Sequence, residues 1–189
     1  MDSEQVILIV DDDATSRLMT QLGLEEAGYA VLEASSGPEA LNLFADNEIA
    51  MVLLDLRMPV MDGFQVCREL QKTKAGSHVP VMVMTGLDDD ASISRAFEAG
   101  ATDFIGKPFN PLLLAQRVRY ILRTHQDTKE LARNEHMLTA AREISGLEMW
   151  EMDENGQLCA SSPELNWLSK SAPLNENKDL FLAKIPEAE

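Results

Sequence analysis

Residues 7–17 read ILIVDDDATSR, an apolar run that ends in three consecutive carboxylates. Four apolar residues in a row, bounded by charge, are typical of a short buried strand. The segment from Thr15 to Ala27 then carries apolar residues at helical spacing and stops at Gly28. A buried strand that turns at once into an amphipathic helix is the repeating unit of a parallel α/β sheet.

The same strand and helix pattern recurs along the first two-thirds of the chain. With a first strand over Val6 to Val10, the predicted strands continue over Ala30 to Ala34, Met51 to Leu54, Val81 to Met84, and Phe104 to Ile105. The helices between them are predicted over Pro38 to Asp46, Phe64 to Lys72, and Ala91 to Ala99, with a last helix from near Asn110. Five such units predict a flavodoxin-like, doubly wound α/β domain with a five-stranded parallel sheet in the order 2-1-3-4-5.

The last helix is predicted to continue past the end of a compact domain. No glycine or proline occurs between Leu112 and Ser145, so one helix of about 50 Å is predicted. Its apolar stripe becomes sparse after Leu122, and we expect it either to pair with another helix or to fray in part. Beyond Gly146, two short strands are predicted around an Asn-Gly turn at Asn155 and Gly156. The predicted divisions are a domain over 1–124, a helical linker over 125–145, and a partial domain or disordered tail over 146–189.

The composition argues against several classes of function. Among 189 residues, 32 are acidic and 16 are basic, giving a formal net charge of −16, and so acidic a chain is poorly suited to direct binding of nucleic acid. No apolar run approaches the roughly 18 residues of a membrane span, and the N-terminus MDSEQ lacks the pattern of a signal peptide. We therefore expect a cytoplasmic protein without membrane contact.

Carboxylates and one lysine follow the predicted strands at a single edge of the sheet. Asp11, Asp12 and Asp13 follow the first strand, Asp55 ends the third, and Lys107 follows the fifth. The carboxyl ends of parallel strands meet at one edge, so these side chains are predicted to converge. Neighbouring carboxylates repel one another unless a cation neutralises them, and oxygen ligands favour Mg²⁺.

With such a cation, Asp55 is the candidate nucleophile, because formation of an aspartyl phosphate is an established form of covalent catalysis. Lys107 would contact one phosphoryl oxygen, and the hydroxyl of Thr85, at the end of the fourth strand, another. Simpler explanations exist for each residue alone: Asp11 to Asp13 as a helix N-cap, and Asp55 as a loop carboxylate. Their occurrence at successive strand ends favours a site.

Four segments together resemble the response regulator receiver family: ILIVDDDATSR (7–17), LLDLRMPVMDG (53–63), VMVMTG (81–86) and GATDFIGKPF (100–109). The resemblance covers residues 4 to 124. It implies that Asp55 accepts a phosphoryl group from a histidine kinase or phosphotransfer protein, with Thr85 and Lys107 as the other catalytic residues. It assigns Mg²⁺ to Asp11, Asp12, Asp55 and the main-chain carbonyl of Arg57.

The resemblance also implies how the signal leaves the site. Thr85 and Phe104 match the family's switch positions, with the readout on the fourth helix, fifth strand and fifth helix. A core aromatic on an inner strand is an equally good interpretation of Phe104. The bond before Pro108 is expected to be cis. Arg57 and Leu87, each two residues after a site residue, depart from the best-known single-domain members, and this bulky pair predicts a long-lived phosphorylated state.

Residues 141–165, AREISGLEMWEMDENGQLCASSPEL, resemble the opening of a PAS domain. We therefore expect a phosphorylation-dependent switch of a two-component system that acts through its fifth helix on a downstream output domain or protein, with cyclic-dinucleotide turnover as one such output. A homodimer is expected. The only reactions expected of the chain are its own phosphotransfer and autodephosphorylation.

Two alternatives stay open. One is a Mg²⁺-dependent phosphohydrolase with an aspartyl nucleophile, although such enzymes commonly place a second aspartate where this chain has Arg57. The other is a phosphate-independent, receiver-like interaction module, against which the complete set of acids, threonine and lysine argues.

Overall fold

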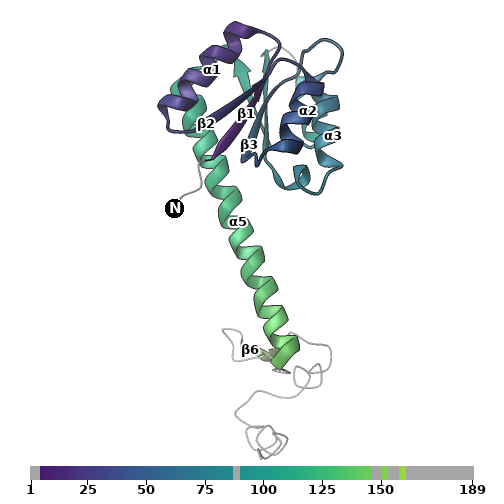
Figure 1. Ribbon diagram of the computed structural model, residues 1–189. Coiled ribbons are helices and arrows are strands. Elements are labelled where there is room, and N and C mark those ends of the chain that lie inside the picture. Colours follow the sequence, from purple (N-terminus) through teal and green to yellow (C-terminus); the bar gives the residue numbers. More distant parts are fainter. Residues whose placement is uncertain (1–4, 87–89, 146–149, 153–157, 161–189) are drawn as a thin grey trace, which may run out of the picture. The chain divides into compact units, whose positions relative to one another are not determined.

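The computed structural model describes residues 5–86, 90–145, 150–152 and 158–160. The chain divides into two compact units, Met1–Thr128 and Lys129–Glu189. The first unit contains a parallel sheet of five strands: β1 (Val6–Val10), β2 (Ala30–Ala34), β3 (Met51–Asp55), β4 (Val81–Gly86) and β5 (Asp103–Lys107). Their order is β2-β1-β3-β4-β5, which confirms the predicted flavodoxin-like fold (Figure 1).

Helices cover both faces of this sheet. One core layer is formed with α1 (Ala14–Glu26) and α5 (Pro111–Ser145), and the other with α2 (Gly37–Asp46), α3 (Gly63–Gln71) and α4 (Asp90–Glu98). Figure 1 shows α1 and α5 on one side of the strands and α2 and α3 on the other. Along β1, Ile7 and Ile9 face the first layer while Leu8 and Val10 face the second, and all four are fully buried. Burial on both faces explains why the strand is apolar without alternation.

Most of the predicted elements end within one or two residues of their observed bounds. The clearest difference is that β4 extends to Gly86 and β5 spans Asp103–Lys107, so Thr85 is the next-to-last residue of β4 and Lys107 is the last residue of β5. Pairing between the two strands accounts for this, because Thr85 pairs with Gly106 and Gly86 pairs with Lys107. Each strand end therefore stabilises the other through the ladder.

The helix α5 is continuous over its 35 residues, as predicted. Leu114, Val118, Ile121 and Leu122 bury its first part against the sheet, whereas Leu131, Met137 and Leu138 are 58–61% exposed. In the second unit, β6 (Trp150–Met152) and β7 (Leu158–Ala160) pair antiparallel, which confirms the two predicted strands. The turn predicted at Asn155 and Gly156 lies outside the described residues. No helix in the described part of the chain has the length and apolar character to cross a membrane.

Candidate functional site

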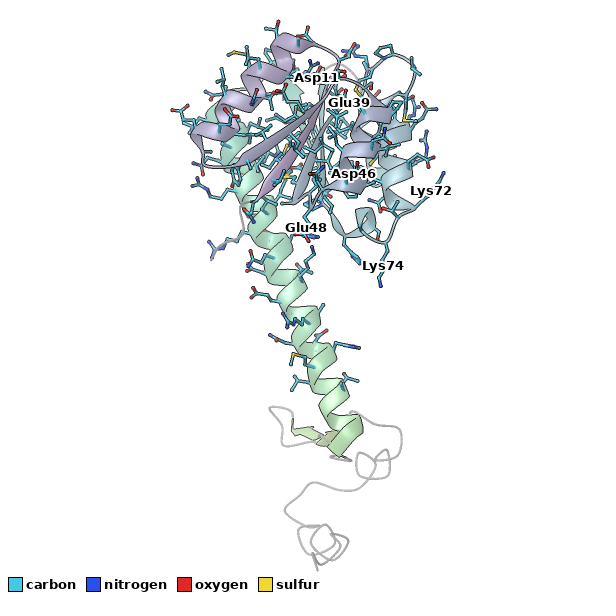
Figure 2. All side chains as sticks on the ribbon, in the orientation of Figure 1. Asp11, Glu39, Asp46, Glu48, Lys72 and Lys74 are labelled. Carbon is cyan, nitrogen blue, oxygen red and sulfur yellow. The ribbon has the colours of Figure 1, made fainter. Side chains whose placement is uncertain are left out.

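The carboxylate of Asp11 lies directly after β1 and is held by the first turn of α1. Asp11 is only 1% exposed. The Asp13 main-chain N–H donates to Oδ1 at 3.0 Å, and the Ser16 hydroxyl donates to Oδ2 at 2.7 Å. These donors replace the water that burial removes from the carboxylate. Figure 2 shows Asp11 at the end of the sheet where β1 passes into α1, with Glu48 and Lys74 at the opposite end.

Asp13 forms the N-cap of α1, so one of the two explanations offered for the acidic run is correct for this residue. Its carboxylate accepts a hydrogen bond from the Ser16 N–H at 2.8 Å. This bond is the main reason that the pKa of Asp13 lies below its usual value. The three consecutive aspartates thus divide their roles, since Asp13 starts the helix and Asp11 points into the site.

Asp55 is the last residue of β3 and is 7% exposed. Its Oδ2 accepts a hydrogen bond from the Arg57 N–H at 2.7 Å. Gly63, the first residue of α3, packs against its main chain so closely that a Cβ there would lie 2.3 Å from the Asp55 carbonyl oxygen. Burial raises the pKa of Asp55 even though Lys107 acts to lower it. An ionised carboxylate at this position is therefore costly without further positive charge.

Lys107 joins the two buried carboxylates. Its Nζ lies 2.6 Å from Asp11 Oδ2 and 2.6 Å from Asp55 Oδ1. Burial alone would lower the pKa of Lys107, but its hydrogen bonds to both carboxylates outweigh burial and raise the pKa above its usual value. The peptide bond between Lys107 and Pro108 is cis, as predicted.

The acidic cluster fits a divalent cation. One carboxylate oxygen from each of Asp11, Asp12 and Asp55 lies within 4.8 Å of the others. Three carboxylates and the single ammonium of Lys107 leave a charge of −3 + 1 = −2, which one divalent cation would balance. All donors are hard oxygens, the type that Mg²⁺ prefers. The site opens into a cavity of about 650 Å³ whose lining includes Asp12, Arg57, Gly86 and Pro108.

The other residues predicted for the site lie at its margin. Thr85 is 8% exposed, and its hydroxyl donates to the Gly86 carbonyl at 3.3 Å instead of lining the cavity. The side chain of Arg57 is exposed and extends over Gly86, where a Cβ would lie 2.7 Å from its Nη2. Leu87 lies outside the described residues.

Phe104 is half-buried on β5 and packs against the α2, α3 and α4 layer. Its ring makes an edge-to-face contact with Phe97, with centroids 6.2 Å apart. The Arg117 guanidinium of α5 lies 5.9 Å from the same ring. Phe104 therefore lies between the core and α5. Since β5 is at the edge of the sheet and the ring is only half-buried, Phe104 is not a core aromatic on an inner strand, and its role as a switch stays a prediction.

Sequence reasoning missed Ser16 and Arg17. Arg17 donates from Nη1 to the Asp11 carbonyl at 2.7 Å and pairs with Glu33 of β2 at 3.3 Å. Both residues look like ordinary members of a helical first turn. Only the recognition of Asp13 as the N-cap would have indicated that the third and fourth helical residues return toward β1.

The structure thus places a lysine between two buried carboxylates at the carboxyl ends of the strands of a doubly wound sheet. Residues 7–119 match the family described as the response regulator receiver domain. The chain therefore belongs to the response regulator receiver family. Receivers of this family bind Mg²⁺ at an acidic pocket and interact with histidine kinases and output domains.

Named proteins show the same relationship. The chain is 39% identical over 140 residues to the "Probable transcriptional regulator ycf27" of Guillardia theta, covering 74% of this chain and 53% of that protein. It is 34% identical over 181 residues to the transcriptional regulatory protein SrrA of Staphylococcus aureus, covering 95% and 70%. The chain thus spans about half of the first relative's length. A CheY-like receiver domain protein from Methanospirillum hungatei JF-1 superposes with a TM-score of 0.63 at 28% identity, covering 67% and 99% of the two chains.

Proposed function

We propose that this chain is a phosphorylation-dependent switch that accepts a phosphoryl group on Asp55 from a histidine kinase or phosphotransfer protein. The observation that carries the proposal is the simultaneous contact of Lys107 with Asp11 and Asp55 beside a third carboxylate. Asp11, Asp12, Asp55 and the main-chain carbonyl of Arg57 would hold Mg²⁺. The bound cation would neutralise carboxylate and phosphoryl charge during transfer.

The chain's own side chains account for the remaining steps. Asp55 attacks the phosphorus of a phosphohistidine through a carboxylate oxygen. The phosphorus–nitrogen bond breaks as the new phosphorus–oxygen bond forms, and the leaving imidazole nitrogen keeps the electron pair and takes up a proton from solvent. Lys107 then moves from the two carboxylates to a phosphoryl oxygen, which it binds as an ammonium. The Thr85 hydroxyl leaves the Gly86 carbonyl for a second phosphoryl oxygen, and the hydrogen bond that it gives up is a weak one at 3.3 Å.

The signal passes from Thr85 to α5 through Phe104. When Thr85 moves toward the phosphoryl group, space opens for the Phe104 ring to turn inward. That movement changes the contact with Arg117, which an ion pair with Asp103 fixes between β5 and α5 at 2.6 Å. The helix α5 thereby receives the switch, and we propose that it carries the change to a downstream output and supports a homodimer.

The nature of the output stays a prediction. Two relatives are named transcriptional regulators, whereas the net charge of −16 favours an output other than direct DNA contact by this chain. Cyclic-dinucleotide turnover by an attached domain is one such output. The PAS-like interpretation of residues 141–165 falls mostly outside the described residues. We propose that the receiver itself catalyses only its own phosphotransfer and hydrolysis.

Phosphorylation with a small-molecule phosphodonor and Mg²⁺, followed by intact-mass measurement, tests this function. The wild type is expected to gain one phosphoryl group, and Asp55→Asn none. Asp46→Asn, which removes an exposed carboxylate at the end of α2, is the matched control and should gain one group. A wild type without mass gain would favour the phosphate-independent module. Rapid turnover of many phosphate esters would favour the phosphohydrolase.

A further inference from the structure

The first turn of α1 carries a hydroxyl in a fixed position. The Ser16 N–H is bound to the Asp13 carboxylate at 2.8 Å, and the Ser16 carbonyl accepts a hydrogen bond from the buried Thr20 hydroxyl at 2.8 Å. With its main chain held on both sides, Ser16 directs its hydroxyl back over the end of β1. There it donates to Asp11 Oδ2 at 2.7 Å.

The same oxygen of Asp11 is also the one that Lys107 binds, at 2.6 Å. Among the described residues, Ser16 and Lys107 provide the side-chain donors to this carboxylate, while the Asp13 N–H occupies Oδ1. A hydroxyl bound to an ionised carboxylate is a strong, charge-assisted hydrogen bond. Asp11 Oδ2 thus has two donors: Lys107, which moves to the phosphoryl group in the proposed function, and Ser16, which has no part in phosphoryl transfer.

We infer that Ser16 is a positioning residue that keeps Asp11 oriented for the metal, both while Lys107 is bound to the same oxygen and after Lys107 leaves it. The inference rests on the proposed function, in which Lys107 transfers to the phosphoryl group. Once that happens, Oδ2 would lose its charged partner, and without another donor on Oδ2 the carboxylate would be held by the Asp13 N–H on Oδ1 alone. The Ser16 hydroxyl retains a donor there. Arg17 supports the same arrangement by holding the Asp11 carbonyl.

This role requires a hydroxyl at position 16, because a side chain without a donor could not bind Asp11 Oδ2. Residues that orient a metal ligand through a hydrogen bond commonly change metal affinity about 10–100-fold when they are removed. Ser16 contacts the ligand and not the cation, so its loss should alter the strength of metal binding while leaving the number of ligands unchanged.

Isothermal titration calorimetry of the full chain with MgCl₂ tests this role. Ser16→Ala should weaken Mg²⁺ binding about tenfold. Ser16→Thr retains the hydroxyl and should bind like the wild type. Thr15→Ala removes an exposed hydroxyl from the neighbouring residue and is the matched control, with unchanged binding expected. A Mg²⁺ affinity of Ser16→Ala equal to or higher than that of the wild type would overturn the inference. A Mg²⁺ affinity of Ser16→Thr as low as that expected for Ser16→Ala would also overturn it.

A second measurement separates positioning from general stability. In metal-free protein, the amide proton of Asp13 reports the orientation of Asp11 because it donates to Oδ1. The chemical shift of this amide proton should differ from the wild-type value in Ser16→Ala and stay close to it in Ser16→Thr. It should differ more when Ser16→Ala is combined with Lys107→Met. If the change in the double variant equals the sum of the changes in Ser16→Ala and Lys107→Met, the two side chains act independently, which would contradict their coupling through Asp11 Oδ2. A wild type that binds no Mg²⁺ would refute the proposed function and this inference together, whereas Mg²⁺ binding that is unaffected by Ser16→Ala refutes the inference alone.

Discussion

Lys107 Nζ lies 2.6 Å from Asp55 Oδ1, although 52 residues separate them in the chain. The two residues end strands that are not neighbours, because β4 runs between β3 and β5. Their contact across an intervening strand is possible only at the carboxyl ends of the strands, where both side chains extend beyond the sheet. Lys107 is thus the cation that makes the metal-free cluster of carboxylates tolerable.

Substitution of Lys107 by methionine should therefore destabilise the metal-free protein. The Lys107 side chain is 26% exposed, so we expect a loss of about 2 kcal/mol in the free energy of unfolding, below the roughly 3–5 kcal/mol for breaking a fully buried pair. Mg²⁺ should restore part of the loss. Urea unfolding with and without Mg²⁺ measures both effects. Lys72 pairs with Glu69 and its side chain is 68% exposed, so Lys72→Met should change stability by less than about 0.5 kcal/mol.

Substitution of Asp55 by asparagine should stabilise the metal-free protein at neutral pH. Burial raises the pKa of Asp55 above its usual 3.8, so the folded protein binds this proton more readily than the unfolded chain does. The ionised group therefore costs stability above its folded pKa, and that cost disappears as the pH falls through the folded pKa toward 3.8. Thermal unfolding of both proteins across this pH range should show that the difference in melting temperature between Asp55→Asn and the wild type becomes smaller as the pH falls. A variant that is less stable than the wild type at neutral pH would contradict this account.

Two glycines should respond to alanine for different reasons. At Gly63 a Cβ would lie 2.3 Å from the Asp55 carbonyl, so Gly63→Ala should cost about 3 kcal/mol and slow phosphorylation by displacing the main chain of Asp55. Gly28 has open space but a φ of +90°, so Gly28→Ala should cost about 1 kcal/mol through backbone strain alone. Urea unfolding and phosphodonor labelling distinguish them. Normal labelling of Gly63→Ala would show that this contact does not position Asp55.

The exposed Arg57 guanidinium should control how long the phosphorylated state lasts. This side chain extends over Gly86 and lines the same cavity as Asp55, so its removal should open a path for water toward Asp55. Arg57→Ala should lose its phosphoryl group several-fold faster than the wild type, as followed by intact mass over time. Arg68→Ala, at an exposed position on α3, is the control. A wild-type half-life of seconds would remove the prediction of a long-lived state.

Much of the fold could be predicted because its elements are encoded locally. The strands β1, β3 and β4 are short, largely apolar runs. Asp13 and Gly28 mark the start and end of α1 through cap and turn chemistry that needs no distant partner. The ends of β4 and β5 were less predictable. Their last residues are in strands because they pair with each other, and that pairing depends on segments about 20 residues apart.

The sequence by itself determined which residues could form the site. Carboxylates at the ends of the first and third strands and a lysine at the fifth must meet, since parallel strands present their carboxyl ends at one edge. Only the tertiary structure decided how these groups share their oxygens. Ser16 and Lys107 meet on Asp11 Oδ2, Thr85 turns to the Gly86 carbonyl, and Arg57 covers Gly86. Hydrogen bonds depend on distances of a few tenths of an ångström, and those distances are set by packing among the strands and helices together.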